Sequence, residues 1–310
     1  MIPGGYRFSR YLEAKKSVDD RALNRNVWDK IANSLSTRPI ELPLKIFEVG
    51  AGIGTMLARM IEWELFHFAE YTGIDSQIEN IQYAHIYLRD WAKHNNYQVS
   101  ESKNGLIVSG KDSEIKVNLL NADLFEYIDS HPSHGFDLLV ANAFLDLVPL
   151  PATLRQLFDW GQKDYLYYFS INYDGLTILE PVIDAQFDQL VLSLYHDTMN
   201  ERIKDGYRYG DHQTGRHLLK SIPREGGSIL SAGSSDWVVY PGPGGYPMGE
   251  AYFLHFIIHT IDKALREVHL LDKQQFTQWI NLRHAQIEHS ELVYIAHQMD
   301  YFGNSRSLEA

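Results

Sequence analysis

A buried strand that runs directly into a glycine-rich turn constrains this chain more than any other segment. Residues 45–56 read KIFEVGAGIGTM, in which an apolar, β-branched and aromatic run precedes three alternating glycines and a helical pattern follows. Because glycine has no Cβ, the backbone of such a loop can turn sharply and approach a ligand closely. The segment predicts a strand–loop–helix unit that holds a nucleotide-type cofactor. The alternative is a tight connection that binds nothing.

The glycine spacing separates the possible cofactors. A dinucleotide-binding loop has the pattern G-x-G-x-x-G. Here the third glycine comes one position early, and Thr55 stands where that pattern has glycine. The observed pattern, Glu48-x-Gly50-x-Gly52-x-Gly54, resembles motif I of the class I S-adenosylmethionine (SAM)-dependent methyltransferases. In that family the loop faces the amino-acid portion of SAM. The resemblance implies cofactor contacts at Glu48, Gly50, Ala51 and Gly52.

Acidic and amide side chains follow the next three apolar runs. Asp75, next to Ser76, lies 25 positions after Gly50, near the ~20 at which related folds place a ribose-binding carboxylate. The resemblance implies that Asp75 accepts from the ribose hydroxyls. It also implies that Asp123 accepts from the adenine amino group beside Leu124 and Phe125, and that Asn142 and Phe144 reach the same sheet edge. For each aspartate the alternative is a helix N-cap. The resemblance covers about residues 44–172.

The expected fold class is α/β: a Rossmann-like sheet of seven mostly parallel strands, with an antiparallel last strand and helical cap insertions. Helices are expected at Ser9–Lys15 and Asp19–Leu35, as a lid or as edge packing, and a surface hairpin at 97–114. Strands five and seven are expected at 164–172 and 291–297. The expected division is 1–43 for the N-terminal helices, 44–172 for the core, 173–213 for a first cap insertion, 214–240 for more core, 241–290 for a second cap insertion, and 291–310 for the last strand and tail.

Residues for the acceptor and the chemistry are sought in the cap. His196 is the predicted general base, on one helix face with Asn200; the alternative is a solvent-facing polar surface. Arg202 is a candidate for holding a substrate carboxylate, with a surface salt bridge as the alternative. Tyr240, at the expected end of strand six, is a third candidate. The full predicted substrate set is Phe144, Tyr195, Arg202 and Tyr240. His255 and His259 share a helix face but lack the glutamate of a zinc motif, so no metal site is predicted.

Composition limits the partners. The chain has 310 residues, 45% hydrophobic and 13% aromatic, with a formal net charge of −12. This charge argues against an electrostatic grip on nucleic acid. The chain contains no cysteine, which excludes disulfides and thiol catalysis and fits a reducing compartment. Because no apolar stretch approaches ~18 residues and the N-terminus lacks a signal-peptide core, a cytoplasmic protein without a membrane span is expected.

Together these features predict a SAM-dependent methyltransferase that acts on a small molecule. Three alternatives stay open: an NAD-type oxidoreductase, a non-catalytic SAM-binding module, and a methyltransferase whose acceptor is a protein. The sequence identifies neither the acceptor nor the methylated atom, and it does not give the oligomeric state.

Overall fold

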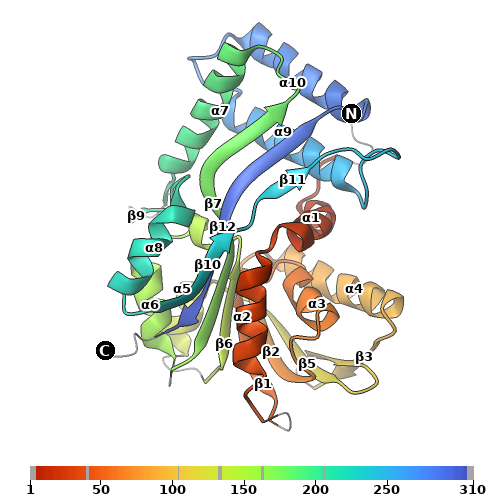
Figure 1. The fold of residues 1–310 in the computed structure, drawn as a ribbon, viewed down its shortest axis with the longest axis vertical. Helices are drawn as coiled ribbons and strands as arrows, with labels where there is room; N and C mark the ends of the chain where they lie inside the picture. The colour runs from red at the N-terminus through yellow and green to blue at the C-terminus, as the bar shows by residue number, and fades with distance from the viewer. Residues whose placement is uncertain are drawn as a thin grey trace.

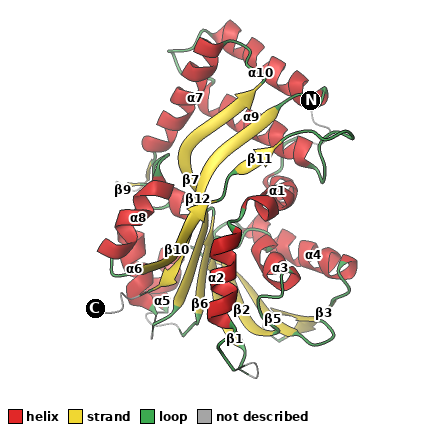
Figure 2. Ribbon diagram, in the orientation of Figure 1, coloured by secondary structure: helices red, strands yellow, loops and turns green. Residues whose placement is uncertain are grey.

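The chain folds as a three-layer α/β structure with a helical cap at one end (Figure 1). The computed structural model describes residues 5–39, 42–103, 105–131, 135–161, 164–204 and 207–305; the side chains of 204, 207 and 208 are not described. Asn104, in the turn of the expected hairpin, therefore lies outside the described residues. The secondary structure is drawn in Figure 2.

The central sheet confirms the expected topology. Its strands run in the order β10-β12-β7-β6-β1-β2-β5-β4-β3. Strands β5, β2, β1, β6 and β7 are parallel, and β12 is antiparallel between β7 and β10. The core strands are β1 (Leu44–Val49), β2 (Phe68–Asp75), β5 (Glu114–Asn121), β6 (Leu138–Asn142), β7 (Leu166–Glu180), β10 (Ser228–Ser234) and β12 (Val293–Asn304). The expected hairpin is also present, as β3 (Gln98–Ser102) and β4 (Gly105–Ser109), and it extends the sheet beyond β5.

Helices cover both faces of the sheet because β1 is apolar on both faces. Successive residues of a strand point to opposite sides, and accordingly Ile46 and Phe47 belong to different hydrophobic clusters. The helices on the Ile46 side are α1 (Phe8–Ala22), α2 (Arg25–Leu35), α3 (Thr55–Glu62) and α4 (Ile78–His94). Those on the Phe47 side are α5 (Leu124–Ser130), α6 (Ala152–Trp160) and α8 (Thr214–Arg224).

The predicted break between the two N-terminal helices was placed too early. Lys15 and Asp19 form an i,i+4 ion pair inside α1, which continues to Ala22. The break comes at Asn24, whose side chain accepts from the backbone N–H of Val27 and caps α2. A polar pair inside a helix and a polar cap look alike in sequence, and this explains the error.

Strands β7 and β12 are longer than predicted. β7 continues to Glu180 instead of ending at Asn172, and β12 continues past His297 to Asn304. Beyond the sheet these two strands rise as a two-stranded ribbon, which the short strand β11 (Trp237–Val239) joins (Figure 1). The predicted sixth strand is therefore split into β10 and β11.

Two irregularities bend β7 where it leaves the sheet. The first lies between two β7–β12 pairs, Phe169–Tyr301 and Asn172–Met299, where β7 has more residues than β12. The second lies in the same way between Tyr173–Gln298 and Thr177–Ala296. Each contains a residue with positive φ, Ile171 at 55° and Gly175 at 78°. Such bulges bend a strand and redirect its side chains. For a β-branched residue like Ile171 a positive φ is a true outlier, held here by a bond from its N–H to Asp300 Oδ1 (2.9 Å).

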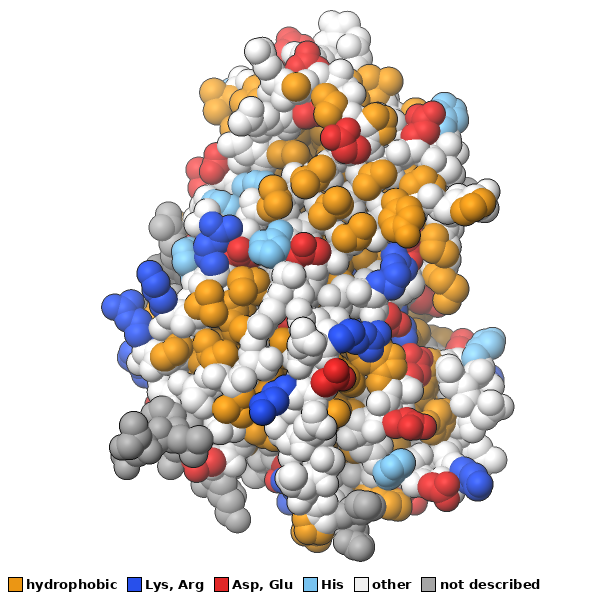
Figure 3. All heavy atoms as spheres, in the orientation of Figure 1, with side chains coloured by type: hydrophobic (Ala, Val, Ile, Leu, Met, Phe, Trp, Pro, Cys, Tyr) orange, Lys and Arg blue, Asp and Glu red, His pale blue; other side chains and the backbone are white. Residues whose placement is uncertain are grey.

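The cap helices pack on the inward face of the ribbon. They are α7 (Ala185–Asn200), α9 (Glu250–Leu265) and α10 (Lys273–Glu288), close to the predicted helical segments. Trp279 of α10 donates its indole N–H to Asp188 of α7, and Arg283 of α10 forms an ion pair with the same carboxylate. The outward face is exposed and apolar, with Leu176, Val238 and Tyr240 about half exposed, and hydrophobic side chains gather over this part of the molecule in Figure 3.

The bend at Gly175 gives a stability prediction. An added Cβ would lie 2.9 Å from His212 Cδ2 and 3.2 Å from the His212 carbonyl oxygen. Gly226, with φ 97°, has nothing within 4 Å of such a Cβ and serves as the control. We expect Gly226→Ala to cost roughly 1 kcal/mol for the left-handed backbone alone. Gly175→Ala should cost at least ~1 kcal/mol more, because the neighbouring backbone must also move. Urea unfolding measures both; equal losses would show that the bend tolerates a side chain.

Candidate functional site

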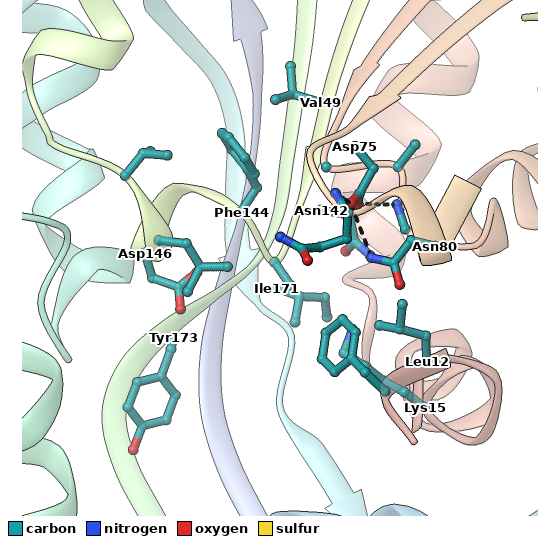
Figure 4. Close-up of a pocket in the computed structure, with 18 of the residues that line it drawn as sticks. Leu12, Lys15, Val49, Asp75, Asn80, Asn142, Phe144, Asp146, Ile171 and Tyr173 are labelled. Atoms are coloured by element: carbon teal, nitrogen blue, oxygen red, sulfur yellow. Dashed lines mark hydrogen bonds between the residues drawn. The ribbon is translucent and has the colours of Figure 1, made fainter. Parts of the chain in front are cut away.

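A cavity of about 550 Å³ lies at the carboxyl ends of the parallel strands, where ligands bind in open α/β sheets. Figure 4 shows its two ends, with Asp75 and Asn80 on one side and Asp146 and Tyr173 on the other. We call the first end the loop half; it is lined by Glu48, Val49, Gly50, Ala51, Gly52, Ile53, Asp75, Ser76, Gln77, Asn80, Asp123, Leu124 and Phe125. We call the second end the ribbon half; it is lined by Asp146, Tyr173, Thr177, Tyr195, Met199, Arg202, Tyr209, Tyr294 and Gln298.

The glycine loop needs glycine at each of its three positions. Gly50, Gly52 and Gly54 all have positive φ, at 66°, 55° and 83°. A Cβ on Gly50 would lie 2.7 Å from a ring carbon of Phe144. Gly50 and Gly52 therefore present bare backbone on a stretch of cavity wall that also includes the predicted residue Ala51.

Asp75 fixes this loop. Its Oδ2 accepts from the backbone N–H of Gly52 (2.9 Å), and its Oδ1 accepts from Gln77 N–H and from the side chain of Asn80 (2.8 and 3.1 Å). A carboxylate offers about four acceptor positions, so these contacts leave one on Oδ2. Asp75 therefore has one free acceptor position, which is enough for one ribose hydroxyl and not for the two that were expected. Ser76 lies beside it on the cavity wall.

Glu48 is a buried acid beneath the loop. It is 1% exposed, and Tyr71 donates to it through its hydroxyl (2.6 Å). Burial raises the pKa of Glu48 to about 8, although the Tyr71 bond and the Arg59 charge act against the rise. A positively charged ligand group beside Glu48 would favour its ionised form.

Asp123 and Asn142 reach the cavity from the ends of two further strands. Asp123 caps α5, because its Oδ1 accepts from Phe125 N–H (2.8 Å) and Glu126 N–H (3.4 Å). It also lines the cavity beside Leu124, so the capping and binding interpretations are compatible. Asn142 accepts from the Ser170 hydroxyl through Oδ1 (2.9 Å), and among the described residues its amide nitrogen has no partner. Asn142 lies between the two halves, near Phe144 (Figure 4).

Helix α1 covers the cavity, whereas α2 packs on β10 and β12 at the sheet edge. Tyr11, Leu12 and Lys15 of α1 all line the cavity. Lys15 is paired with Asp19 (2.5 Å), which also accepts from the indole N–H of Trp237 on β11 (2.8 Å). Helix α1 therefore lies at the cavity and α2 at the sheet edge, and a lid role for α1 stays a prediction.

The structure does not bring two predicted residues to the cavity. Tyr240 is 59% exposed on the outward side, because β11 follows the ribbon and does not end at the ligand edge. His196 lies behind the wall, with Nε2 2.7 Å from the Tyr173 hydroxyl and 3.2 Å from Thr177 Oγ1. Burial and the nearby His212 lower the pKa of His196 to about 4, so it is neutral near pH 7 and a weak base. The direct-base role predicted for His196 does not fit this position.

Several wall residues were missed by sequence reasoning. Asp146 follows the end of β6 by four positions, in the short 3₁₀ helix η1 (Leu145–Leu147), and this proximity to a strand end was its only signal. Gln298 was missed because strand seven was expected to leave the ligand edge within a few residues. Thr177 was placed in an insertion, whereas β7 continues through it. The predicted residues Phe144, Tyr195 and Arg202 do line the cavity.

The histidines that were set aside as metal ligands have other partners. His255 Nδ1 lies 2.8 Å from His284 Nδ1, and His259 stacks on Tyr6. Among the residues that the structure describes, no group of three or more His, Cys, Asp or Glu side chains is arranged to hold a metal ion. Within the same residues, no helix combines the length and the apolar character that a membrane crossing requires.

Comparison with known proteins gives weak overall matches. No protein-family model matches the sequence, and no curated protein matches it. Among solved structures, E. coli YjhP aligns at 10% identity and TM-score 0.44, over 95% of this chain and 98% of its own. A Haemonchus contortus phosphoethanolamine N-methyltransferase 2, solved with phosphomonomethylethanolamine and S-adenosylhomocysteine, aligns at 9% identity and TM-score 0.38, over 99% of this chain and 62% of its own. A geranyl diphosphate methyltransferase, solved with GPP and sinefungin, aligns at 8% identity and TM-score 0.38, over 89% and 76%. Because these values are low, function is inferred from the site alone.

Glu48 gives a pH prediction. With a pKa of about 8 in the folded chain and 4.5 as its ordinary value, Glu48 binds more protons when folded, so it makes stability fall as pH rises through this interval. Glu48→Gln should therefore make the loss of stability with rising pH smaller. Its free energy of unfolding should exceed that of wild type by about 2–4 kcal/mol at pH 8.5 and differ little at pH 4.5. Urea unfolding across pH tests this. Glu70→Gln, on β2 with an exposed ion pair to Lys116, is the control and should keep the wild-type slope. The same gain at both pH values would rule out the titration of Glu48 as the cause.

Proposed function

We propose that this chain is a SAM-dependent methyltransferase that acts on a small-molecule acceptor. One observation carries the proposal. A loop of three left-handed glycines, tied to Asp75 by the Gly52 N–H and underlain by the buried Glu48, forms the end wall of a cavity that Asp123 and Asn142 also line. These are the positions at which the motif resemblance places the SAM contacts.

The strand order supports SAM over a dinucleotide. A dinucleotide-binding Rossmann sheet has six parallel strands in the order 3-2-1-4-5-6. Here an antiparallel strand, β12, lies between β7 and β10. The glycine spacing, with Thr55 at the start of α3, points the same way. Both features weigh against an NAD-type oxidoreductase.

The residues of the loop half fit the parts of SAM. Glu48 is the proposed partner of the cofactor's ammonium group, whose charge would favour the ionised carboxylate. The backbone of Gly50–Gly52 lines the cavity next to it. The free acceptor position of Asp75 suits one ribose hydroxyl, with Ser76 adjacent. Asp123 Oδ2 has no partner among the described residues and suits the adenine amino group, next to Leu124. Asn142 lies between the halves, and its proposed place is beside the transferring methyl group.

SAM supplies an electrophilic methyl group, and the protein is left with alignment and the exclusion of water. Phe144 and Asn142 set the passage between the two halves. Helix α1 lines the cavity with Tyr11, Leu12 and Lys15. The cap segments 173–213 and 241–290 would then set the choice of acceptor. A formal charge of −12 favours a small molecule over nucleic acid, and the absence of cysteine suits a cytoplasmic location.

Cofactor binding tests the proposal directly. We expect calorimetry to detect binding of SAM and S-adenosylhomocysteine, and to detect NAD at least 100-fold more weakly or not at all. Asp75→Asn should weaken SAM at least tenfold, because the amide nitrogen it introduces cannot accept from a ribose hydroxyl or from Gly52 N–H. Asp112→Asn, on an exposed turn between β4 and β5, is the matched control. Tighter binding of NAD than of SAM, or equal SAM affinity in both variants, would contradict the assignment.

His196 is proposed to position Tyr173. His196→Ala should lower turnover about 3- to 10-fold while SAM affinity stays near wild type, because the Tyr173 hydroxyl loses a 2.7 Å partner at the cavity wall. The pH profile above pH 6 should keep its shape, since the pKa of His196 lies near 4. A Tyr173→Phe variant should reproduce the loss, and adding His196→Ala to it should lower turnover little further. A pH profile that loses an ionisation near neutrality would instead restore His196 as a base.

A further inference from the structure

The ribbon half contains buried polar atoms that have no partner within the described ranges of the chain. Gln298 is 1% exposed and lines the cavity, yet its amide nitrogen bonds to none of the described residues. Asp146, also on this wall, has a buried Oδ1 for which the described part of the chain offers no hydrogen-bond partner. More than ~90% of buried polar atoms in folded proteins are bonded, and leaving one unpaired costs about 1–3 kcal/mol. One donor and one acceptor of residues on this wall therefore have unmet hydrogen-bonding capacity.

A cation faces the same space. Arg202 lines the cavity and forms no ion pair with any carboxylate of the described residues. Its carbonyl oxygen accepts from Tyr209 N–H (3.0 Å), and the next residue, Gly210, donates to the Val148 carbonyl (2.9 Å). A Cβ on Gly210 would lie 2.8 Å from the Asp146 Cα. This close packing holds Arg202 and Asp146 on one wall, although no ion pair joins them.

The charges of Asp146 and Arg202 influence each other although the two side chains are not paired. Burial raises the pKa of the Asp146 carboxyl, and Arg202 acts to lower it. The cavity wall also contributes five tyrosines: Tyr11, Tyr173, Tyr195, Tyr209 and Tyr294. Burial raises the pKa of Tyr195 to about 12, so this hydroxyl is neutral near pH 7. Neutral aromatic faces next to a carboxylate favour an organic cation.

We propose that the ribbon half binds a small zwitterion, with its ammonium group at Asp146 among the tyrosines and its acidic group at Arg202. Such a ligand pairs with both half-buried charged side chains at once. A simple amine leaves Arg202 unpaired, a simple acid leaves Asp146 unpaired, and a neutral alcohol leaves both. The Gln298 amide supplies a further donor to the ligand. The inference rests on the proposed function, in which this zwitterion is the methyl acceptor.

The inference is tested by measuring how small molecules bind to the protein saturated with S-adenosylhomocysteine. No turnover occurs, because this cofactor product has no methyl group to transfer. Calorimetry is run with the twenty amino acids, β-alanine and O-phosphoethanolamine, and then with the amine, acid and alcohol analogues of the tightest zwitterion. We expect that zwitterion to bind at least tenfold more tightly than each analogue. Arg202→Met should lower its affinity to that of the amine, and Asp146→Asn to that of the acid. Arg155→Met, an exposed surface pair with Glu225, should change nothing.

The outcomes separate the two proposals. If S-adenosylhomocysteine does not bind, the proposed function fails, and the inference fails with it. If it binds with wild-type affinity to the Arg202 and Asp146 variants, these variants are folded and the acceptor comparison is valid. An acid, amine or alcohol that binds as tightly as its zwitterion, or no binding by any zwitterion in the panel, would then overturn the inference and leave the methyltransferase proposal standing.

Discussion

The hydrogen bond from Gly52 N–H to Asp75 Oδ2 joins the ends of β1 and β2, and the cavity depends on it. The same carboxylate bonds Gln77 N–H and Asn80, so the glycine loop and the start of α4 are held by one side chain. With Gly50 and Gly54 also in the left-handed region, the loop has little freedom to adopt another shape. Asp75 therefore shapes the end wall of the cavity and still has one acceptor position free for a ligand.

Much of the fold and the loop half of the site could be predicted from sequence because the signals are local. Apolar runs mark buried strands, and in a parallel sheet their carboxyl ends meet at one edge. Asp75, Asp123 and Asn142 each follow such a run directly, so their convergence on one cavity needed only the strand order. The glycine spacing also constrained the shape of the loop, which strand patterns alone do not.

The ribbon half could not be predicted because its determinants are not local. The two bulges in β7 interrupt the alternation of side chains, so sequence reasoning ended the strand at Asn172 when it continues to Glu180. Tyr195 and His196 are neighbours on α7, and only the packing of that helix decides that the tyrosine lines the cavity while the histidine lies behind it. Asp146 and Gln298 belong to no sequence motif. Each is distinguished by a buried polar atom that has no partner among the described residues, and only the folded structure shows which atoms are buried.

The ribbon also limits how this chain can diversify. Along β12, Tyr294, Ala296 and Gln298 are buried on the inward side, and Val293, Ile295 and His297 alternate with them. Because side chains alternate along a strand, inserting or deleting one residue here would exchange the two sets. Loops tolerate such length changes, but this strand does not. Ligand preference in descendants of this sequence can therefore shift through replacement of inward side chains, whereas the length of β12 must be inherited unchanged.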